Sequence, residues 1–408
     1  MSKLDELIKE LCPSGVEYKT LGELGSFYGG LTGKSKDDFT NGNAKFISYM
    51  NVYSNLALDI NMPDRVKVRN HERQNTVQYG DVLFTGSSEN TIECGMSSVL
   101  TIKTEEPLYL NSFCFGYRFN NSELYSPDFT KYLFRSAELR RQIIRTASGV
   151  TRFNVSKKKM EKVVIPVPPM EVQREIVRIL DNFTELTAEL TAELTAELTA
   201  RKKQYKYYRD QLLTFDDSVP MVKVKEEFTR LKGTPITATK MKEIESANGE
   251  VRIFAGGKTV INAHEKDIPN ANITRVPSVL VQSRGIIDFI YYDKPFTFKN
   301  EMWAYTHSNS TTLKYLYHVF KNNAQNFRSA STGMGAMPQI SLTVTEDFLF
   351  PLPSPEEQER IVSILDRFDA LCNDISIGLP AEIEARKKQY KYYRDKLLSF
   401  PKIDREVC

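Results

Sequence analysis

The residues of this chain whose types could catalyse a reaction or bind a ligand are a glycine-rich turn, four histidines and two basic runs rich in tyrosine. The turn, at residues 29–35, reads GGLTGKS. A loop that wraps a phosphate needs four residues between its first glycine and the Gly-Lys-Ser, whereas Gly29 leaves three and position 28 is Tyr28. We therefore interpret this segment as a glycine turn in a surface loop. Residues 333–335 (GMG) also lack the rest of a dinucleotide fingerprint, and we expect no cofactor.

The chain shows no constellation of residues that would catalyse a reaction. None of the histidines stands at metal-ligand spacing: His71, His264, His307 and His318. The five cysteines are scattered without a C-x-x-C pair, which is typical of a protein in a reducing cytosol. The chain also lacks a sequence of the Asn-Pro-Pro-Tyr type, the kind found in enzymes that methylate exocyclic amines. We predict no catalytic residue and no metal site.

The composition is that of a soluble protein with packed cores. The 408 residues are enough for two or three domains, and 41% are hydrophobic and 26% charged. The N-terminus has no apolar leader core, and no stretch approaches the length of a membrane span. Because the formal charge is only +3, any surface that binds nucleic acid must be local.

The two basic runs are identical: RKKQYKYYRD occupies residues 201–210 and again 386–395. On a helix Tyr205 and Tyr208 lie in one stripe, and the basic residues lie beside it. A solvated flank over packed tyrosines and a surface for phosphate or an acidic partner are equally compatible with this pattern. Identical recurrence favours a shared task, such as docking two copies of one partner. The candidate docking residues are Lys202, Lys203, Lys206, Arg209, Lys387, Lys388, Lys391 and Arg394.

The elements that carry these runs are two copies of one long segment. Residues 165–215 return as residues 350–400, and a constant offset of 185 residues relates the two copies without a gap. The first copy predicts one helix from about residue 172 to 213, and its 38 residues from Ile176 to Leu213 would span about 57 Å. The second copy contains Gly378, Leu379 and Pro380, so we expect a kink or break there.

Each copy carries an apolar stripe that must be buried. The stripe lies within roughly ±60° of one direction on a helical wheel, and the second copy keeps it although the TAEL repeats are absent there. Burying one stripe against the other about a pseudo-two-fold axis makes the helices antiparallel. The candidate helix–helix packing residues are Leu186, Leu190, Leu194, Leu198, Tyr205 and Tyr208, with Leu371, Ile375, Leu379, Ile383, Tyr390 and Tyr393.

The remaining sequence forms two globular segments whose strand-like runs and helices occur in the same order while their loops differ. We expect an α+β fold with two similar mixed domains joined by the long helices. The predicted parts are a lead-in at 1–20, a first domain at 21–164, the first element at 165–215, a second domain at 216–349, the second element at 350–400 and a tail at 401–408. Different loops on one framework are typical of two sites with different ligands.

Base readout would belong in the loops that differ. Lysine and arginine reach phosphates or guanine edges, and glutamine pairs with adenine. The loops of interest are residues 30–36, 85–90 and 149–154 in the first domain, and 256–259, 282–285 and 333–339 in the second. The candidate DNA-binding residues are Lys34, Ser35, Lys36, Thr85, Ser87, Ser88, Thr151, Arg152, Lys258, Thr259, Gln282, Ser283, Arg284 and Gln339.

The order of domain, I-P-x-P-x-x-E-x-Q helix, domain and second such helix resembles the specificity subunit of type I restriction-modification enzymes. The TAEL array and the closing LPAEIEARKKQYKYYRDKLLSFPK resemble its IC subfamily in particular. The resemblance covers essentially the whole chain. It implies two target-recognition domains, each of which reads half of a bipartite site in double-stranded DNA. It also implies helices that space the domains and seat two modification subunits.

By the same resemblance, the modification subunits carry the S-adenosylmethionine chemistry, and restriction subunits with ATP-driven translocation join the core. The specificity subunit itself would be non-catalytic and cytoplasmic. Two other interpretations differ from this one. A stand-alone methyltransferase or nuclease would need motifs that the chain lacks. A coiled-coil scaffold without DNA contact would not explain why the domain loops differ while the helices are preserved.

Overall fold

The computed structural model describes residues 2–257, 259–331, 338–373 and 378–403. The chain forms two compact units. Unit 1 consists of Met1–Ala192 and Glu384–Cys408, and unit 2 of Glu193–Ile383. Each unit therefore holds one globular domain with part of each long element. The boundaries between the units fall inside the long helices. The boundaries suggested by the sequence, at 20, 164, 215 and 349, instead separate the globular domains from the long helices, and they stay a prediction.

Unit 1 begins with α1 (Lys3–Leu11), the amphipathic lead-in. Ser2 caps this helix: its side chain accepts a hydrogen bond from the Asp5 N–H, and the Asp5 carboxylate accepts one from the Ser2 N–H. β1 (Glu17–Thr20) then pairs antiparallel with β13 (Val164–Val167), the strand that leads into the first long helix. The lead-in and the end of domain 1 are thus joined before the helix starts.

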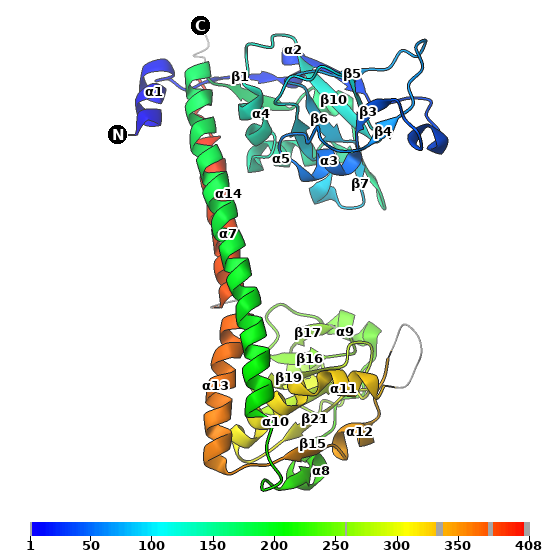
Figure 1. The fold of residues 1–408 in the computed structure, drawn as a ribbon, viewed down its shortest axis with the longest axis vertical. Helices are drawn as coiled ribbons and strands as arrows, with labels where there is room; N and C mark the ends of the chain where they lie inside the picture. Colours follow the sequence, from blue (N-terminus) through cyan, green and yellow to red (C-terminus); the bar gives the residue numbers. More distant parts are fainter. Residues whose placement is uncertain (1, 258, 332–337, 374–377, 404–408) are drawn as a thin grey trace. The chain divides into compact units, whose positions relative to one another are not determined.

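The core of domain 1 lies between short sheets and helices (Figure 1). One sheet has the order β2-β10-β6-β8 (Gly25–Gly29, Cys114–Phe119, Val82–Thr85, Ser97–Val99). A second has the order β4-β3-β9-β5 (Arg65–Val66, Ala44–Ile47, Leu108–Leu110, Thr76–Val77), and a third β11-β12-β7 (Ala147–Ser148, Phe153–Val155, Ser87–Ser88). The helices of this domain are α2 (Leu21–Leu24), α3 (Tyr49–Ser54), α4 (Pro127–Leu133), α5 (Ala137–Ile144) and α6 (Lys157–Met160).

The apolar periodicity of residues 128–146 favours one helix, but this segment forms two helices, α4 and α5. Ser136 separates them because it adopts an extended conformation, and its side chain accepts a hydrogen bond from the Leu139 N–H. A serine that caps a new helix competes with continuation of the preceding one. The apolar periodicity continues through this junction, so it did not reveal the break. The interruption orients α5 separately from α4.

Domain 2 repeats the topology of domain 1. Its four-stranded sheet has the order β15-β21-β18-β19 (Thr229–Leu231, Trp303–Thr306, Ser278–Gln282, Asp288–Tyr292). The other sheets are β17-β16-β20 (Val260–Ala263, Val251–Phe254, Phe296–Phe298) and β14-β22 (Met221–Lys223, Leu349–Pro351). The parallel pair β16–β20 matches the parallel pair β3–β9 of domain 1. The helices are α8 (Val224–Glu227), α9 (Ala238–Ile244), α10 (Ser310–Asn322), α11 (Ala324–Ser329) and α12 (Leu342–Glu346).

The first long element is a single helix, α7 (Met170–Leu212), whose 43 residues span about 65 Å. The second element is two helices, α13 (Pro355–Asn373) and α14 (Leu379–Leu397), so the expected break is confirmed. Pro380 is the second residue of α14. A proline in the first helical turn loses no intrahelical hydrogen bond, which explains why the helix restarts there.

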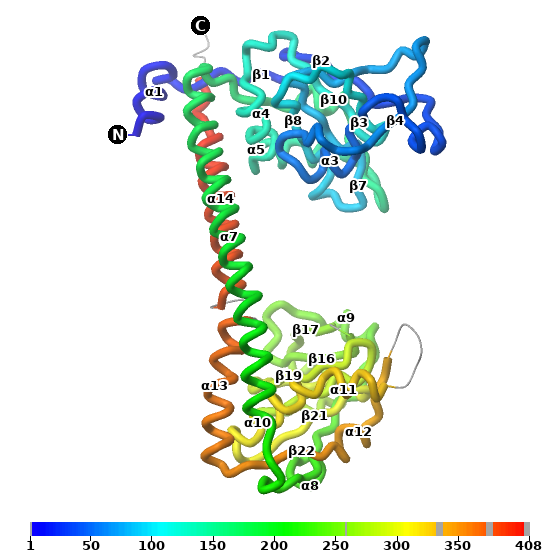
Figure 2. Tube along the Cα trace, viewed as in Figure 1, coloured from blue at the N-terminus to red at the C-terminus, as the bar shows by residue number. Residues whose placement is uncertain are grey.

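Within each unit, α7 runs antiparallel to part of the second element (Figures 1 and 2). In unit 1 the rings of Phe183 and Tyr393 lie 6.0 Å apart, centroid to centroid. In unit 2 the rings of Phe368 and Tyr208 lie 5.7 Å apart. The two pairs are equivalent under the 185-residue offset. Each unit therefore pairs the first half of one element with the second half of the other.

The buried seam of α7 differs from the predicted stripe. Apart from Leu190 and Gln204, the buried and half-buried positions from 180 to 205 alternate three and four residues apart: Leu180, Thr184, Thr187, Thr191, Leu194, Leu198, Arg201 and Tyr205. This is the 3.5-residue period of a coiled coil, whereas the TAEL leucines recur every four residues and drift around the helix by about 40° per repeat. Threonines occupy the seam where the leucines have turned away from it.

Two of the predicted packing residues, Leu186 (60% exposed) and Leu371, are consequently exposed and were wrongly placed in the seam. Tyr208 and Tyr393 are also partly exposed, but their rings pack across the helix pair against Phe368 and Phe183. Tyr205 is buried, and the half-buried members of the set are Leu190, Leu194, Leu198, Leu379, Ile383 and Tyr390. Ile375 lies outside the described residues. Cys372, at the position equivalent to Thr187, is buried in the second element. The seam thus follows the same positions in both copies.

Candidate nucleic-acid and partner surfaces

The candidate loops of domain 1 gather at one edge of its four-stranded sheet. The end of β2 and the start of β10 are adjacent, because Gly29 pairs with Phe115. The end of β6 meets the same start, because Thr85 pairs with Cys114. The hairpin β11–β12 joins them through the pairing of Phe153 with Ser88. We call the segments 29–36, 85–90, 111–113 and 147–157 the loop edge of domain 1.

Cations and exposed apolar side chains lie together on this loop edge. The guanidinium of Arg152 lies 5.7 Å from the centre of the Phe113 ring, and its Nε donates a 3.1 Å hydrogen bond to Ser87 Oγ. The ammonium of Lys157 lies 5.7 Å from the centre of the Phe115 ring. Lys36 and Thr151 are exposed. This combination of charge and apolar surface suits contact with a nucleic acid.

Three predicted residues of domain 1 have structural tasks instead. Thr85 is fully buried, and its Oγ1 accepts a 2.9 Å hydrogen bond from the Met96 N–H. The Lys34 side chain is only 4% exposed, and its ammonium donates to the Glu72 carboxylate and to a backbone carbonyl. Ser87 is also buried and accepts the bond from Arg152. Placing Thr85, Ser87 and Lys34 on the DNA-facing surface was wrong, because neighbouring strands and loops cover them.

Two further candidates of domain 1 support their own loops. Ser35 is exposed, and both its N–H and its Oγ donate to the Asp38 carboxylate, at 2.9 and 3.0 Å. Ser88 is half-buried, and its Oγ accepts a 3.1 Å hydrogen bond from the Asn90 N–H. Their hydroxyls lie on the loop edge, but the hydrogen bonds reduce their freedom to turn toward a ligand.

The candidate loops of domain 2 meet at the corresponding edge. β18 ends at Gln282 and β21 starts at Trp303, which pairs with the neighbouring Val281. Arg284 forms an isolated antiparallel bridge with Gln339, and both residues are exposed. A cavity of about 510 Å³ opens beside Arg284, and its lining includes Gly257, Thr259 and Gly285. Three separate loops therefore converge around one hollow.

Two polar candidates of domain 2 build this hollow rather than face solvent. Gln282 is buried, and its Nε2 donates a 2.9 Å hydrogen bond to the Gly257 carbonyl. Ser283 is fully buried and donates to the Glu301 carbonyl. Both were wrongly predicted to be accessible for DNA binding, because their side chains are buried. Lys258 and residues 333–337 lie outside the described residues.

The identical basic runs present lysines and tyrosines to solvent. All six lysines of the docking prediction are exposed: Lys202, Lys203, Lys206, Lys387, Lys388 and Lys391. The two arginines bind within their own units. Arg209 donates a 2.9 Å hydrogen bond to Asn322 Oδ1, and Arg394 pairs with Asp395 at 2.8 Å.

Two exposed tyrosines escaped the sequence reasoning. Tyr207 is 61% exposed and Tyr392 is 62% exposed, and these positions are equivalent in the two runs. A helical wheel contains the signal, because Tyr207 lies about 200° from Tyr205 and cannot share its buried face. Each lysine flank thus includes an aromatic side chain that is mostly exposed within its own unit.

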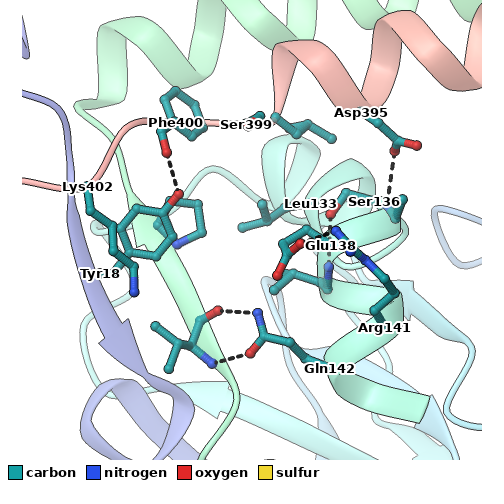
Figure 3. A pocket seen from close by; sticks show the side chains of 15 residues that line it. Tyr18, Leu133, Ser136, Glu138, Arg141, Gln142, Asp395, Ser399, Phe400 and Lys402 are labelled. Atoms are coloured by element: carbon teal, nitrogen blue, oxygen red, sulfur yellow. Dashed lines mark hydrogen bonds and ion pairs between the residues drawn. The ribbon is translucent and has the colours of Figure 1, made fainter. Parts of the chain in front are cut away.

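The second element meets domain 1 at a joint around the start of α5 (Figure 3). Asp395 Oδ1 accepts a 3.0 Å hydrogen bond from the Ala137 N–H, so α14 supplies a cap to a helix of the domain. The Tyr18 hydroxyl donates to the Phe400 carbonyl at 2.7 Å. Gln142 exchanges two hydrogen bonds with the backbone of Val164. A hollow of about 400 Å³ remains between these groups.

Both units also contain the same lysine–aspartate contact between a domain helix and a long helix. In unit 1, Lys131 pairs with Asp181 at 3.1 Å, and in unit 2, Lys314 pairs with Asp366. The two aspartates are equivalent under the 185-residue offset. Asp366 also accepts a 2.8 Å bond from His318 Nε2. Burial acts to raise the pKa of Asp366, but the hydrogen bonds from His318 and Lys314 keep it below its ordinary value.

Comparison with known proteins identifies the family. Residues 13–200 and 221–385 match the family model of the type I restriction modification DNA specificity domain. The chain belongs to this family. Each match begins before a domain and ends in a long helix, at Ala200 and at the equivalent Ala385. The repeating unit of this specificity-domain protein is therefore one domain with the helix that follows it.

Two relatives in the specificity-domain family are similar over much of the chain. The specificity subunit of type I restriction enzyme EcoR124I/EcoR124II from Escherichia coli is 37% identical over 269 residues, which are 61% of this chain and 65% of that subunit. A putative type I restriction enzyme specificity subunit from Haemophilus influenzae is 33% identical over 272 residues, with 62% and 68% covered. The aligned segment thus spans about two thirds of each relative.

Solved structures share the fold. A chain from a study of complex assembly and conformational transition of the type I R-M system has a TM-score of 0.65 at 15% identity, covering 94% of this chain and 97% of that one. The HsdS subunit from Thermoanaerobacter tengcongensis has a TM-score of 0.50 at 16% identity, covering 95% and 96%.

The described part of this specificity-domain chain contains neither a candidate metal cluster nor a candidate membrane span. No group of three or more histidine, cysteine, aspartate or glutamate side chains there could hold a metal ion. No helix in the same residues is long and apolar enough to span a membrane.

Proposed function

We propose that this chain is the DNA sequence-recognition subunit of a type I restriction-modification complex, and that each domain reads one half of a bipartite, asymmetric target. The observation that carries the proposal is the loop edge. Two domains of one topology end their central strands at the same edge but present different side chains there. Domain 1 presents Phe113 and Arg152, whereas domain 2 presents Arg284 and Gln339 beside a hollow. Different surfaces on one framework suit two different half-sites.

The long helices would set the distance between the half-sites and seat two modification subunits. The support is the identity of the two basic runs and the exposure of their lysines, with Tyr207 and Tyr392. Tyrosine is enriched at protein interfaces. The TAEL array supports assignment to the IC subfamily. We place the complex in the cytoplasm, together with restriction subunits, and the four described cysteines, which are free and buried, suit that compartment.

In this proposal the chain itself catalyses nothing, and the partner subunits supply the S-adenosylmethionine and nuclease chemistry. The deciding experiment is methylome sequencing of cells that express the chain with its modification subunits. We expect adenine methylation at one bipartite motif with a fixed spacer. The purified chain alone should methylate no DNA. Methylation by the chain alone, or the absence of any bipartite motif with both components present, would contradict the proposal.

A further inference from the structure

Phe113 is an exposed aromatic residue at the centre of the loop edge of domain 1. It is 58% exposed although it directly precedes the buried strand β10. The Asn111 side chain accepts a 2.8 Å hydrogen bond from the Phe113 N–H, and the Phe113 carbonyl accepts one of 2.8 Å from the Gly86 N–H. The backbone under the ring is thus fixed between two strand ends. A large apolar side chain held in water on a rigid base indicates a contact that the isolated chain does not make.

The surroundings of Phe113 indicate a partner that is both negatively charged and apolar. The Arg152 guanidinium lies against the ring, 5.7 Å from its centre. Val150, at the tip of the hairpin that carries Arg152, is 91% exposed. Lys157 and Lys158 are exposed on the segment that follows the hairpin. Double-stranded DNA has phosphates for the cations and base faces or thymine methyl groups for the apolar side chains.

Domain 2 differs at the corresponding place. In the segment before β21, Lys299 and Glu301 form an ion pair at 3.0 Å, and Met302 is buried. The same edge there opens into the hollow beside Arg284. Domain 1 therefore has a projecting ring where domain 2 has a recess, so the feature does not belong to the shared framework.

We infer that Phe113 is a specificity-determining residue that packs against bases in the half-site read by domain 1, while Arg152 orients the ring and lies near a phosphate. This inference rests on the proposed function and adds an apolar base contact to the polar candidate residues. Apolar side chains that press against a base step unstack it in part. The contact therefore predicts a change in base stacking as well as in affinity.

The test compares Phe113→Ala with Tyr79→Ala in the full chain assembled with its modification subunits. Tyr79 is a matched control: it is exposed, and Lys103 lies 5.9 Å from the centre of its ring. It lies just before β6, and the loop edge lies at the other end of that strand, after Thr85. The Gly80 N–H next to it bonds to the Leu100 carbonyl beyond the end of β8, the antiparallel neighbour of β6. Phe113→Leu keeps an apolar side chain and should retain part of the effect.

The first measurement is binding to the motif found for the wild-type complex. We expect Phe113→Ala to weaken it roughly 5- to 150-fold, the range for loss of one base–aromatic contact, with Tyr79→Ala unchanged. The second measurement places 2-aminopurine at successive purines of the half-site. We expect the wild-type complex to raise the 2-aminopurine fluorescence at one base step. The Phe113→Ala complex should leave the fluorescence at that step unchanged. Methylome sequencing should show relaxed sequence at one or two neighbouring positions in that half-site alone.

The outcomes separate the inference from the function on which it rests. A wild-type complex without a bipartite motif overturns the proposed function itself. A normal motif together with equal binding by Phe113→Ala and Tyr79→Ala overturns only the inference. So does a loss of binding that is uniform across sequences and leaves the 2-aminopurine signal unchanged, because such a loss would reflect phosphate contact without base contact.

Discussion

At the scale of single residues, two nearby lysines show how burial separates a structural role from a binding role. Lys34 and Lys36 are two positions apart in a basic loop. The Lys34 ammonium is enclosed by Glu72 and a backbone carbonyl, whereas Lys36 is exposed. An exposed lysine is free to meet a phosphate, but an enclosed one has already exchanged water for protein partners.

We expect the substitutions Lys34→Ala and Lys36→Ala to affect different properties. Lys34→Ala removes the donor of Glu72 and should lower the urea midpoint of unfolding. Lys36→Ala should leave the midpoint unchanged and reduce the slope of log K against log salt for DNA binding by about 1, as for one lost phosphate contact. Urea titration and binding at several salt concentrations measure both effects. Equal midpoints for the two variants would contradict the assignment.

Asp366 is expected to contribute stability that depends on pH. Its pKa is lowered in the folded state, so the stabilisation is present above the unfolded value near pH 3.9 and is lost as the pH falls through the lower folded value. Asp366→Asn should reduce the free energy of unfolding by about 1 kcal/mol at pH 7, and the difference from wild type should shrink below about pH 4.

Asp217→Asn, at an exposed position in the same unit, is the control for Asp366→Asn and should match wild type throughout. Denaturant unfolding followed at pH 7 and at several values below 5 measures the effect. A deficit that stays constant down to pH 3 would assign the role of Asp366 to packing rather than to charge.

At the scale of elements, the 3.5-residue seam predicts which TAEL leucines matter. Leu198 is half-buried and packs against the core of unit 2, whereas Leu186 is mostly exposed. Leu198→Ala should cost about 1–2 kcal/mol of unfolding free energy, less than for a fully buried leucine, and Leu186→Ala should cost less than about 0.5 kcal/mol. Urea unfolding of both variants checks this. A larger loss of stability for Leu186→Ala than for Leu198→Ala would contradict the 3.5-residue seam and favour the stripe in which every TAEL leucine is packed.

The TAEL repeat is also expected to act as a ruler. Deleting residues 191–194 shortens α7 by about 6 Å and turns its far end by about 40°, close to the roughly 35° between neighbouring base pairs. The non-specific spacer should shorten by one base pair with both half-sites unchanged. Methylome sequencing gives the spacer directly, and an unaltered spacer would refute the ruler.

Deleting Glu193 alone is the contrasting variant for the ruler. It turns everything beyond it by about 100° and moves the seam by a full residue, whereas the four-residue deletion moves the 3.5-residue seam by only half a residue. Activity should therefore collapse with the single deletion. Full activity of that variant would show that rotation is unimportant.

At the scale of the whole molecule, each unit combines one domain with halves of both long elements. The contacts that hold each domain on its helices recur in equivalent form, as with Lys131–Asp181 and Lys314–Asp366. The side chains at the loop edges differ between the two domains. Equivalent residues thus attach each domain to the long helices, whereas different residues form its loop edge. A domain could therefore be exchanged without changing its attachment to the helices.

Replacing residues 21–164 with the corresponding domain of another specificity subunit should change one half-site and leave the other as it was. The hybrid must retain Lys131, which pairs with Asp181 of α7, and the start of α5, where the Ala137 N–H donates to Asp395 of α14, to preserve the contacts with the helices. Methylome sequencing of the hybrid complex shows both half-sites together. A simultaneous change in both would mean that the domains do not read independently.

The sequence by itself determined the duplication, the long helix and the break before Pro380, because each depends on local propensity or on periodicity along the chain. The location of exposed side chains was not determined in this way. Thr85, Gln282 and Ser283 have the composition of a binding loop, yet neighbouring strands bury them, and Phe113 looks like a core residue but projects into solvent. The seam of α7 likewise depends on where the partner helix lies. Only the tertiary structure decided these points, because burial is set by residues that are distant in the sequence.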